Sequence, residues 1–354
     1  MTFLDAPYIF QIGGIAAAVT LLFALPGLWL ARRLTLIDNP GRADHKKHTR
    51  PVPLAGGIII ALSFLAISPF LGLWETPAMR GILLAGLVVM LFGAWDDWKI
   101  LPAWLKLAGQ LIAAAIVISS GTSVHFITRL APMDINPLIL KSIDWTITIL
   151  WLVGITNAFN LIDSMDGLVI GTSGVALCFF LLATFDSEQT SLVKLSTMLL
   201  GICAGLYFFN AAPASLFLGD SGAQLLGFFM ACIGILYSPP NYPQGSSWFI
   251  PILLLGVPIF DTTMVFFSRL RRRKPIHLAD LSHTYHRLVL LGLDTRKAVV
   301  LMHLAGLFLG CIAFVALSLP PLAANLIFGS ILLIGAVLII LLEGVVRKKD
   351  SPAN

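Results

Sequence analysis

Five aspartates stand at the ends of hydrophobic segments of this chain. They are Asp96, Asp97, Asp163, Asp166 and Asp220. Acidic side chains at membrane depth are costly, and by default they mark a functional site. Carboxylates that share a site repel one another and raise one another's pKa, so we expect a cation to hold them. Mg²⁺ fits best, with Mn²⁺ as the alternative, because Mg²⁺ is bound by one or two carboxylates together with substrate phosphates and waters.

A simpler interpretation is that each aspartate caps the helix that follows it, since Asp is a preferred N-cap residue. For Asp220 alone, which precedes Ser221, Gly222 and a new apolar segment, capping explains the residue as well as a functional role does. Capping does not explain why five aspartates gather on one side of the chain. We therefore interpret them together as a functional site.

Amide side chains accompany two of the aspartates. Asn157, Asn160, Asp163 and Asp166 recur every three residues, so a helical or 3₁₀ continuation would place them along one stripe. Asn offers both a donor and an acceptor, which suits a nucleobase or a sugar amide. The spacing predicts a cavity lined by these four polar groups.

A histidine segment forms the fourth polar element. His283 and His286 are three residues apart and Arg287 follows directly, so in a helix they would point towards a common ligand. Arginine and histidine suit phosphate recognition. The basic run at 271–274 is explained equally well as an anchor that fixes membrane topology.

The composition places these residues in a bilayer. Of the 354 residues, 58% are hydrophobic and only 12% are charged, which far exceeds the apolar share of a soluble domain. The net charge of +5 does not indicate nucleic acid, because anionic lipid headgroups attract basic juxtamembrane loops. The four cysteines lie inside apolar stretches without the spacing of metal ligands, which argues against disulfides and zinc. P-loop and zincin motifs are missing.

We predict an all-α, polytopic integral membrane protein with about eleven transmembrane helices, since a spanning helix needs roughly 17 to 25 apolar residues. The predicted stretches are 8–31, 54–73, 79–95, 103–120, 143–160, 167–185, 193–210, 222–238, 247–268, 297–318 and 322–343. We expect residues 1–354 to form a single membrane-embedded domain. Its cytoplasmic loops would lie at about 32–53, 96–102, 161–166, 211–221 and 269–296.

The distribution of basic residues predicts the orientation, because cytoplasmic loops collect lysine and arginine. With the N-terminus outside and the C-terminus in the cytoplasm, nearly all of the 23 basic residues lie inside. The exceptions are Arg80, Arg129, Lys141 and Lys194. The same threading delivers all five aspartates to the cytoplasmic face, which predicts a multi-pass protein of the inner membrane with its active site on that face.

A series of short motifs runs along nearly the whole chain. They are Asp38-Asn-Pro40, the segment His48 to Gly57, the pair Asp96-Asp97, Lys106 to Gln110, Asn157 to Gly167, Asn210, Phe217 to Gly222, Pro258 to Thr262, and the histidine segment. In their order and topology they resemble the polyprenyl-phosphate N-acetylhexosamine-1-phosphate transferases of glycosyltransferase family 4. These are integral membrane enzymes that begin lipid-linked glycan synthesis.

The resemblance implies transfer of a HexNAc-1-phosphate from a UDP-sugar to undecaprenyl phosphate, with release of UMP. It makes Asp220 the principal Mg²⁺ ligand, and it assigns Asp96 and Asp97 to positioning or deprotonating the lipid phosphate. Asp163 and Asp166 would bind the nucleotide side, Phe217 would stack on uracil, and the histidines would hold the donor diphosphate or sugar. Further substrate-binding residues would be His48, Lys106, Asn157, Asn160, Asn210 and Arg287.

The histidine segment departs from the family pattern. Bacterial GlcNAc-1-phosphate transferases typically carry paired histidines where this chain has Tyr285-His286, and the MurNAc-pentapeptide branch carries three. GlcNAc is therefore the first choice, another UDP-HexNAc of cell wall, lipopolysaccharide or O-antigen synthesis the second, and UDP-MurNAc-pentapeptide a further alternative. The implied partners are the two substrates and membrane lipids but no nucleic acid, and a homodimer is left open. A secondary transporter is the competing class, although transporters place their sites near the bilayer centre.

Overall fold

The computed structural model describes residues 6–40, 50–125, 136–185, 189–239, 241–272 and 283–350. Most of this is helix, as the all-α prediction requires, and turns and loops join the helices. The described strands are two short antiparallel ones, β1 (Ile37–Asp38) and β2 (Val52–Pro53), which pair Ile37 with Pro53. The first helices are α1 (Ala6–Arg33), α2 (Gly56–Ile67), α3 (Pro77–Trp98), α4 (Ala103–Ser119), α6 (Pro137–Ile162), α7 (Leu168–Thr184) and α8 (Thr190–Asn210). The later ones are α9 (Gly219–Leu236), α10 (Gln244–Ser247), α11 (Ile250–Leu254), α12 (Gly256–Arg271), α13 (Thr284–Leu290), α14 (Thr295–Leu317) and α15 (Pro321–Asp350).

Each predicted apolar stretch falls on an apolar helix of the structure. Seven of the described helices are long and apolar enough to cross a membrane, and the pair formed by α10–α11 and α12, bent by 67°, makes an eighth if it is one span. The helices α2, α4 and α7 are apolar but shorter. The chain is thus a multi-pass membrane protein, whereas the count of eleven crossings stays a prediction.

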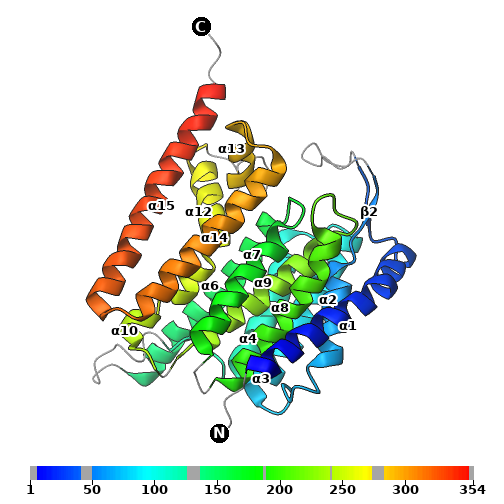
Figure 1. Cartoon of the computed structure of the whole chain (residues 1–354), viewed down its shortest axis with the longest axis horizontal. Helices are drawn as coiled ribbons and strands as arrows, with labels where there is room; N and C mark the ends of the chain where they lie inside the picture. The colour runs from blue at the N-terminus through cyan, green and yellow to red at the C-terminus, as the bar shows by residue number, and fades with distance from the viewer. Residues whose placement is uncertain are drawn as a thin grey trace.

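Helix α9 lies at the centre of the bundle. It packs against α2, α3, α6, α7, α8 and α11. Of its apolar 18-residue stretch, 72% is buried inside the protein, whereas only 6% of the corresponding stretch of α15 is buried. In Figure 1 α15 stands at the edge of the molecule. The strand β2, helix α13 and the C-terminus lie on the side of the molecule opposite the N-terminus (Figure 1).

Helices α3 and α9 approach each other closely at the start of α9, because α3 presents a glycine there. A Cβ atom at Gly93 would lie 2.6 Å from the Cα of Ser221 and 2.8 Å from its backbone nitrogen. Helix backbones come this near only where one of them carries a small residue. Gly93 therefore sets the distance between the two helices that carry three of the five aspartates.

Substituting Gly93 by alanine should destabilise the protein by about 1–3 kcal/mol, the usual cost of overpacking, because backbone atoms of α9 must move. Thermal unfolding in detergent measures the effect. The matched control is Gly174→Ala in α7, where an added Cβ meets nothing within 4 Å. There the gain in helix propensity should leave the melting temperature equal or higher. Equal behaviour of the two variants would contradict the packing role of Gly93.

Candidate active site

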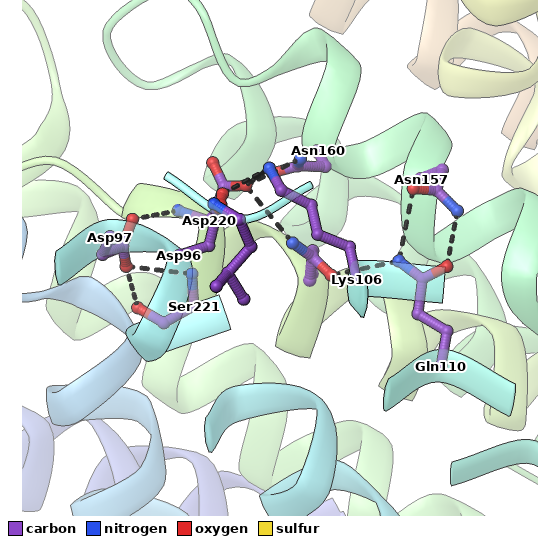
Figure 2. A network of polar contacts seen from close by, with 10 residues as sticks. Asp96, Asp97, Lys106, Gln110, Asn157, Asn160, Asp220 and Ser221 are labelled. Carbon is purple, nitrogen blue, oxygen red and sulfur yellow. Dashed lines mark hydrogen bonds and ion pairs between the residues drawn. The ribbon is translucent and has the colours of Figure 1, made fainter. Parts of the chain in front are cut away.

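Three hydrogen bonds converge on one oxygen of Asp220. This residue lies in the first turn of α9. Its Oδ2 accepts bonds from Lys106 Nζ at 2.8 Å, Asn160 Nδ2 at 3.3 Å and Gln224 Nε2 at 3.4 Å. The three donors come from α4, α6 and α9, and Figure 2 shows Lys106 and Asn160 beside the Asp220 carboxylate. The structure thus places Asp220 at the junction of three helices.

Lys106 joins two of the aspartates. Its ammonium group pairs with Asp96 Oδ2 as well as with Asp220, so it lies between carboxylates from α3 and α9. The other oxygen of Asp96 accepts a hydrogen bond from the Leu101 amide at 2.6 Å, which holds the connection between α3 and α4. Lys106 therefore neutralises part of the negative charge of Asp96 and Asp220.

Asp97 caps helix α9 from outside that helix. Its Oδ1 accepts from the Asp220 amide at 2.7 Å, and its Oδ2 accepts from the Ser221 amide at 3.1 Å and the Ser221 hydroxyl at 2.6 Å. The residue at the N-cap position of α9, Leu218, makes no side-chain cap. Asp97 supplies the acceptor that an N-cap side chain normally gives to the second and third helical amides, and its charge opposes the helix dipole.

Gly219 makes room for this cap. Its φ of +68° lies in the left-handed region, and a Cβ there would lie 2.7 Å from the Asp97 carboxylate. Both oxygens of Asp97 are occupied by donors of α9, so the geometry gives Asp97 the task of holding Asp220 in place. The predicted action of Asp97 on the lipid phosphate stays a prediction.

A row of buried amides extends from Asp220. Gln110 Nε2 donates to Asn157 Oδ1 at 3.2 Å and to Gln224 Oε1 at 3.1 Å, and Asn157 Nδ2 donates back to Gln110 Oε1 at 2.7 Å. Asn157 is therefore linked to Asp220 through Gln110 and Gln224, and Figure 2 shows the paired amides of Asn157 and Gln110. The sequence reasoning missed Gln224 as a site residue. Its position one helical turn after Asp220, in an otherwise apolar helix, was the available signal.

The turn at 163–167 follows the end of α6 and is tied to the loop before α9. Asp166 Oδ2 accepts from the Ala214 amide at 2.9 Å. The Gly167 amide donates to Asn210 Oδ1 at 3.1 Å, and Asn210 Nδ2 donates to the Leu216 carbonyl at 3.1 Å. Asn210 is thus a buried link between two connections.

The loop before α9 is also tied to the segment that follows β2. The Phe217 amide donates to the Pro53 carbonyl at 2.9 Å, and the Gly56 amide donates to the Phe217 carbonyl at 3.1 Å. These bonds place the start of α9 on the side of the molecule that holds β2 in Figure 1. Stacking of Phe217 on uracil stays a prediction.

The Asp163 carboxyl lies among other acids. Burial raises the pKa of Asp163 well above its usual range, and the carboxylates of Asp220, Asp97 and Asp166 raise this pKa further. No described residue donates a hydrogen bond to the Asp163 side chain. The position therefore favours a cation near it.

The oxygen-donor set suits Mg²⁺. Asp220, Asp163 and Asn160 offer the hard oxygen ligands that Mg²⁺ prefers. The described residues contain no group of three or more His, Cys, Asp or Glu arranged to hold a metal ion. That is consistent with an ion that takes one or two carboxylates and completes its shell with waters and substrate phosphates.

The histidine segment builds a second polar cluster with residues of α12 and α15. His283 Nδ1 lies 2.7 Å from Asp261 Oδ2, and His283 is only 6% exposed. Arg287 is fully buried, where its guanidinium donates to Glu343 at 2.5 Å and to the Ser268 hydroxyl at 3.0 Å. This burial favours a structural role for Arg287 over the predicted substrate contact. His286 is partly exposed, and His48 lies outside the described residues.

The segment contacts the turn at 163–167, which we call the aspartate turn. The hydroxyl groups of Tyr285 and Ser164 form a hydrogen bond, and Ser164 follows Asp163 directly. Of the predicted residues, Asp96, Asp97, Lys106, Asn157, Asn160 and Asp220 therefore share one network. Asp163 lies near its carboxylates, Asp166 and Asn210 hold the neighbouring turn and loop, and the histidines contact Tyr285.

Comparison with known proteins identifies the family. Residues 79–238, which hold all five aspartates, match the family model described as glycosyl transferase family 4. The chain is 31% identical over 323 residues to the probable undecaprenyl-phosphate N-acetylglucosaminyl 1-phosphate transferase of Bacillus subtilis, covering 91% of this chain and 88% of that protein. It is 28% identical over 374 residues to the decaprenyl-phosphate N-acetylglucosaminephosphotransferase of Mycobacterium leprae, covering 96% and 91%.

A relative from another branch matches less of the chain. The phospho-N-acetylmuramoyl-pentapeptide-transferase of Lactiplantibacillus plantarum is 29% identical over 212 residues, covering 57% of this chain and 66% of that protein. The fold, the site and these matches define a phosphoglycosyl transferase built into a membrane. The chain belongs to glycosyl transferase family 4, which confirms the family that the motifs predicted.

Replacing Asp163 by asparagine should raise the melting temperature of the metal-free protein, and the gain should grow with pH. The carboxyl titrates near pH 4 when unfolded and at a higher pH when folded. The wild type therefore loses stability as the pH rises from about 4 through the folded pKa. Asparagine does not titrate. Thermal unfolding in detergent with a chelator, at about pH 5 and about pH 8, measures the difference.

Asp294→Asn is the control of opposite sign. The Lys297 amide and ammonium hold the pKa of Asp294 below its usual range, so this carboxylate stabilises the protein above pH 4. Its loss should lower the melting temperature by a similar amount at both pH values, whereas the gain from Asp163→Asn should grow with pH. A gain from Asp163→Asn that is equal at both pH values would contradict the electrostatic explanation.

Proposed function

We propose that this enzyme transfers GlcNAc-1-phosphate from UDP-GlcNAc to undecaprenyl phosphate, with release of UMP, as the first membrane step of cell-surface polysaccharide synthesis. The observation that carries the proposal is the convergence of Asp96, Lys106 and Asp220 from three helices. A carboxylate cluster with one resident lysine suits a reaction between two phosphate esters. The printed names of the B. subtilis and M. leprae relatives support the GlcNAc-1-phosphate group and the polyprenyl phosphate acceptor.

In the proposed reaction an oxygen of the lipid phosphate attacks the β-phosphorus of the UDP-sugar. The bond from this phosphorus to the bridging oxygen breaks, and UMP leaves with the electron pair. Such a transfer needs mainly in-line positioning and neutralisation of anionic oxygens. A Mg²⁺ ion at Asp220, or Mn²⁺ in its place, would neutralise the diphosphate when bound.

The side chains of the cluster have distinct proposed tasks. Lys106 lies between Asp96 and Asp220, so its ammonium group would bind a phosphate oxygen of a bound substrate. Asp96, once released from Lys106, would orient the lipid phosphate or accept its proton. Asp97 keeps the start of α9 in place throughout, because its oxygens are bound to the Asp220 and Ser221 amides.

GlcNAc is proposed as the sugar because the two relatives that cover about nine-tenths of the chain carry it in their names. Another UDP-HexNAc remains the second choice. UDP-MurNAc-pentapeptide is the third, since the L. plantarum relative matches over 57% of the chain.

We also propose that the site faces the cytoplasm of the inner membrane. The start of α9 is tied to β2, and the aspartate turn is tied to α13. Both elements lie opposite the N-terminus in Figure 1. Basic residues Arg32, Arg33, Arg269 and Arg271 end α1 and α12, and such residues collect on the cytoplasmic side.

Purified protein should release UMP from UDP-GlcNAc only when undecaprenyl phosphate and Mg²⁺ are present. Asp220→Asn should lower this turnover by at least about a hundredfold, since the variant loses charge where the diphosphate is neutralised. Coupled UMP detection measures the rate, and size-exclusion elution reports folding. The control is Glu75→Gln, an exposed acid between α2 and α3, which should keep wild-type activity. No UMP from any UDP-HexNAc would refute the proposal.

Direct attack by the lipid makes a second prediction. Without undecaprenyl phosphate, labelled UMP should not exchange into UDP-GlcNAc, because no glycosyl-phosphate is stored on the enzyme. A covalent aspartyl intermediate would instead support this exchange at a rate comparable to turnover. Exchange at that rate would replace direct attack by a two-step mechanism while leaving the overall reaction unchanged.

A further inference from the structure

The turn that carries Asp163 and Asp166 has a second support, which no sequence motif assigned. We propose that Tyr285 and Asp261 are positioning residues that hold this turn against α13. The contact is the hydrogen bond between the Tyr285 and Ser164 hydroxyl groups. The proposal rests on the proposed function only where it assigns the turn to the UDP-sugar side of the reaction.

Tyr285 is placed to act as a fixed support. It is 1% exposed, and its ring stacks on His283 with centroids 5.4 Å apart and planes 13° from parallel. A side chain this deeply buried has its rotamer set by its surroundings. Because its hydroxyl is bonded to Ser164, Tyr285 acts on the site through the turn.

Asp261 fixes the start of α13. It lies on α12 and is fully buried. Its Oδ2 lies 2.7 Å from His283 Nδ1, and its Oδ1 accepts from the Thr284 amide at 2.6 Å. The two bonds secure both the stacking partner of Tyr285 and the first residue of α13. A buried carboxylate with both oxygens engaged is costly to disturb.

The other end of α13 is anchored as well. Arg287 donates to the Glu343 carboxylate and the Leu342 carbonyl of α15, and to the Ser268 hydroxyl of α12. With both ends held, α13 presents the Tyr285 hydroxyl at a constant position. The turn is then supported on one side by Ala214 and Asn210, through the loop before α9, and on the other by Tyr285.

This arrangement also accounts for the departure from the family pattern. The family that the motifs resemble typically carries a histidine at the position of Tyr285, and the prediction of the sugar rests on this histidine segment. Because the Tyr285 ring is buried and its hydroxyl is bonded to Ser164, we assign Tyr285 a role in positioning the aspartate turn. The residue should therefore affect how well the UDP-sugar binds more than which sugar is chosen.

Tyr285→Phe tests the support, because it removes only the hydroxyl. The KM for UDP-GlcNAc should rise about three- to tenfold, the effect of losing one hydrogen bond of ordinary strength. The KM for undecaprenyl phosphate should stay unchanged. Ser164→Ala should have the same effect, and the double variant should be no worse than either single one, because both remove the same contact.

A readout that needs no activity completes the test. In hydrogen–deuterium exchange the peptide spanning 160–168 should exchange faster in Tyr285→Phe, Ser164→Ala and Asp261→Asn than in the wild type. The matched control is Tyr237→Phe, which removes another buried tyrosine hydroxyl. That hydroxyl, at the far end of α9, makes no hydrogen bond among the described residues. Its removal should leave this peptide and the KM unchanged.

Wild-type exchange and KM in Tyr285→Phe would overturn the proposal, and so would fully additive effects of Tyr285→Phe and Ser164→Ala. A different result would be that the wild type releases no UMP while all three variants exchange faster. That result would confirm that Tyr285 and Asp261 hold the turn, and it would refute the proposed function. An equal rise in the KM for both substrates would show general loosening of the site and would overturn the assignment of the turn to the UDP-sugar.

Discussion

The site depends on the hydrogen bonds that the first amides of α9 donate to the Asp97 carboxylate. A helix start inside a membrane protein leaves amide groups without partners, and Leu218 has no side-chain acceptor for them. Asp97 supplies both acceptors from α3. The cap therefore satisfies α9 and also fixes α3 against it, where Gly93 and Gly219 leave the room. Asp220 is the second residue of the capped helix, so the same contact sets its position relative to Lys106.

Charge balance explains the rest of the arrangement. In the described part of the site one lysine ammonium faces two carboxylates, those of Asp96 and Asp220, and Asp163 lies close to further acids. Such a cluster is unfavourable until a cation or a cationic contact compensates it. This electrostatic repulsion lies at the place where a bound divalent ion and the diphosphate of a substrate would reduce it. Residues at functional sites often trade stability for reactivity in this way.

The histidine segment shows that neighbours in the sequence can make separate contacts. The spacing of His283, His286 and Arg287 predicted a common ligand, and this stays a prediction. In the structure the rings of His283 and His286 lie 6.4 Å apart and His283 faces Asp261, whereas Tyr285 bonds to Ser164 and Arg287 forms a buried ion pair with Glu343. Residues on successive helical positions point in different directions, and only packing against α12 and α15 decides which of these directions leads to the site.

The sequence by itself determined that this is a helical membrane protein with its acids near helix ends, because hydropathy and charge act on each segment separately. The motifs around Asp96, Asn157 and Asp220 also sufficed for the family. Only the tertiary structure decided that Asp97 is a cap, that Gln224 belongs to the network, and that Arg287 is buried. Those assignments depend on contacts of α9 with α3 and α4, and of α13 with α12 and α15. A side chain's hydrogen-bond partners follow from the packing of the helices, and no local pattern of residues records them.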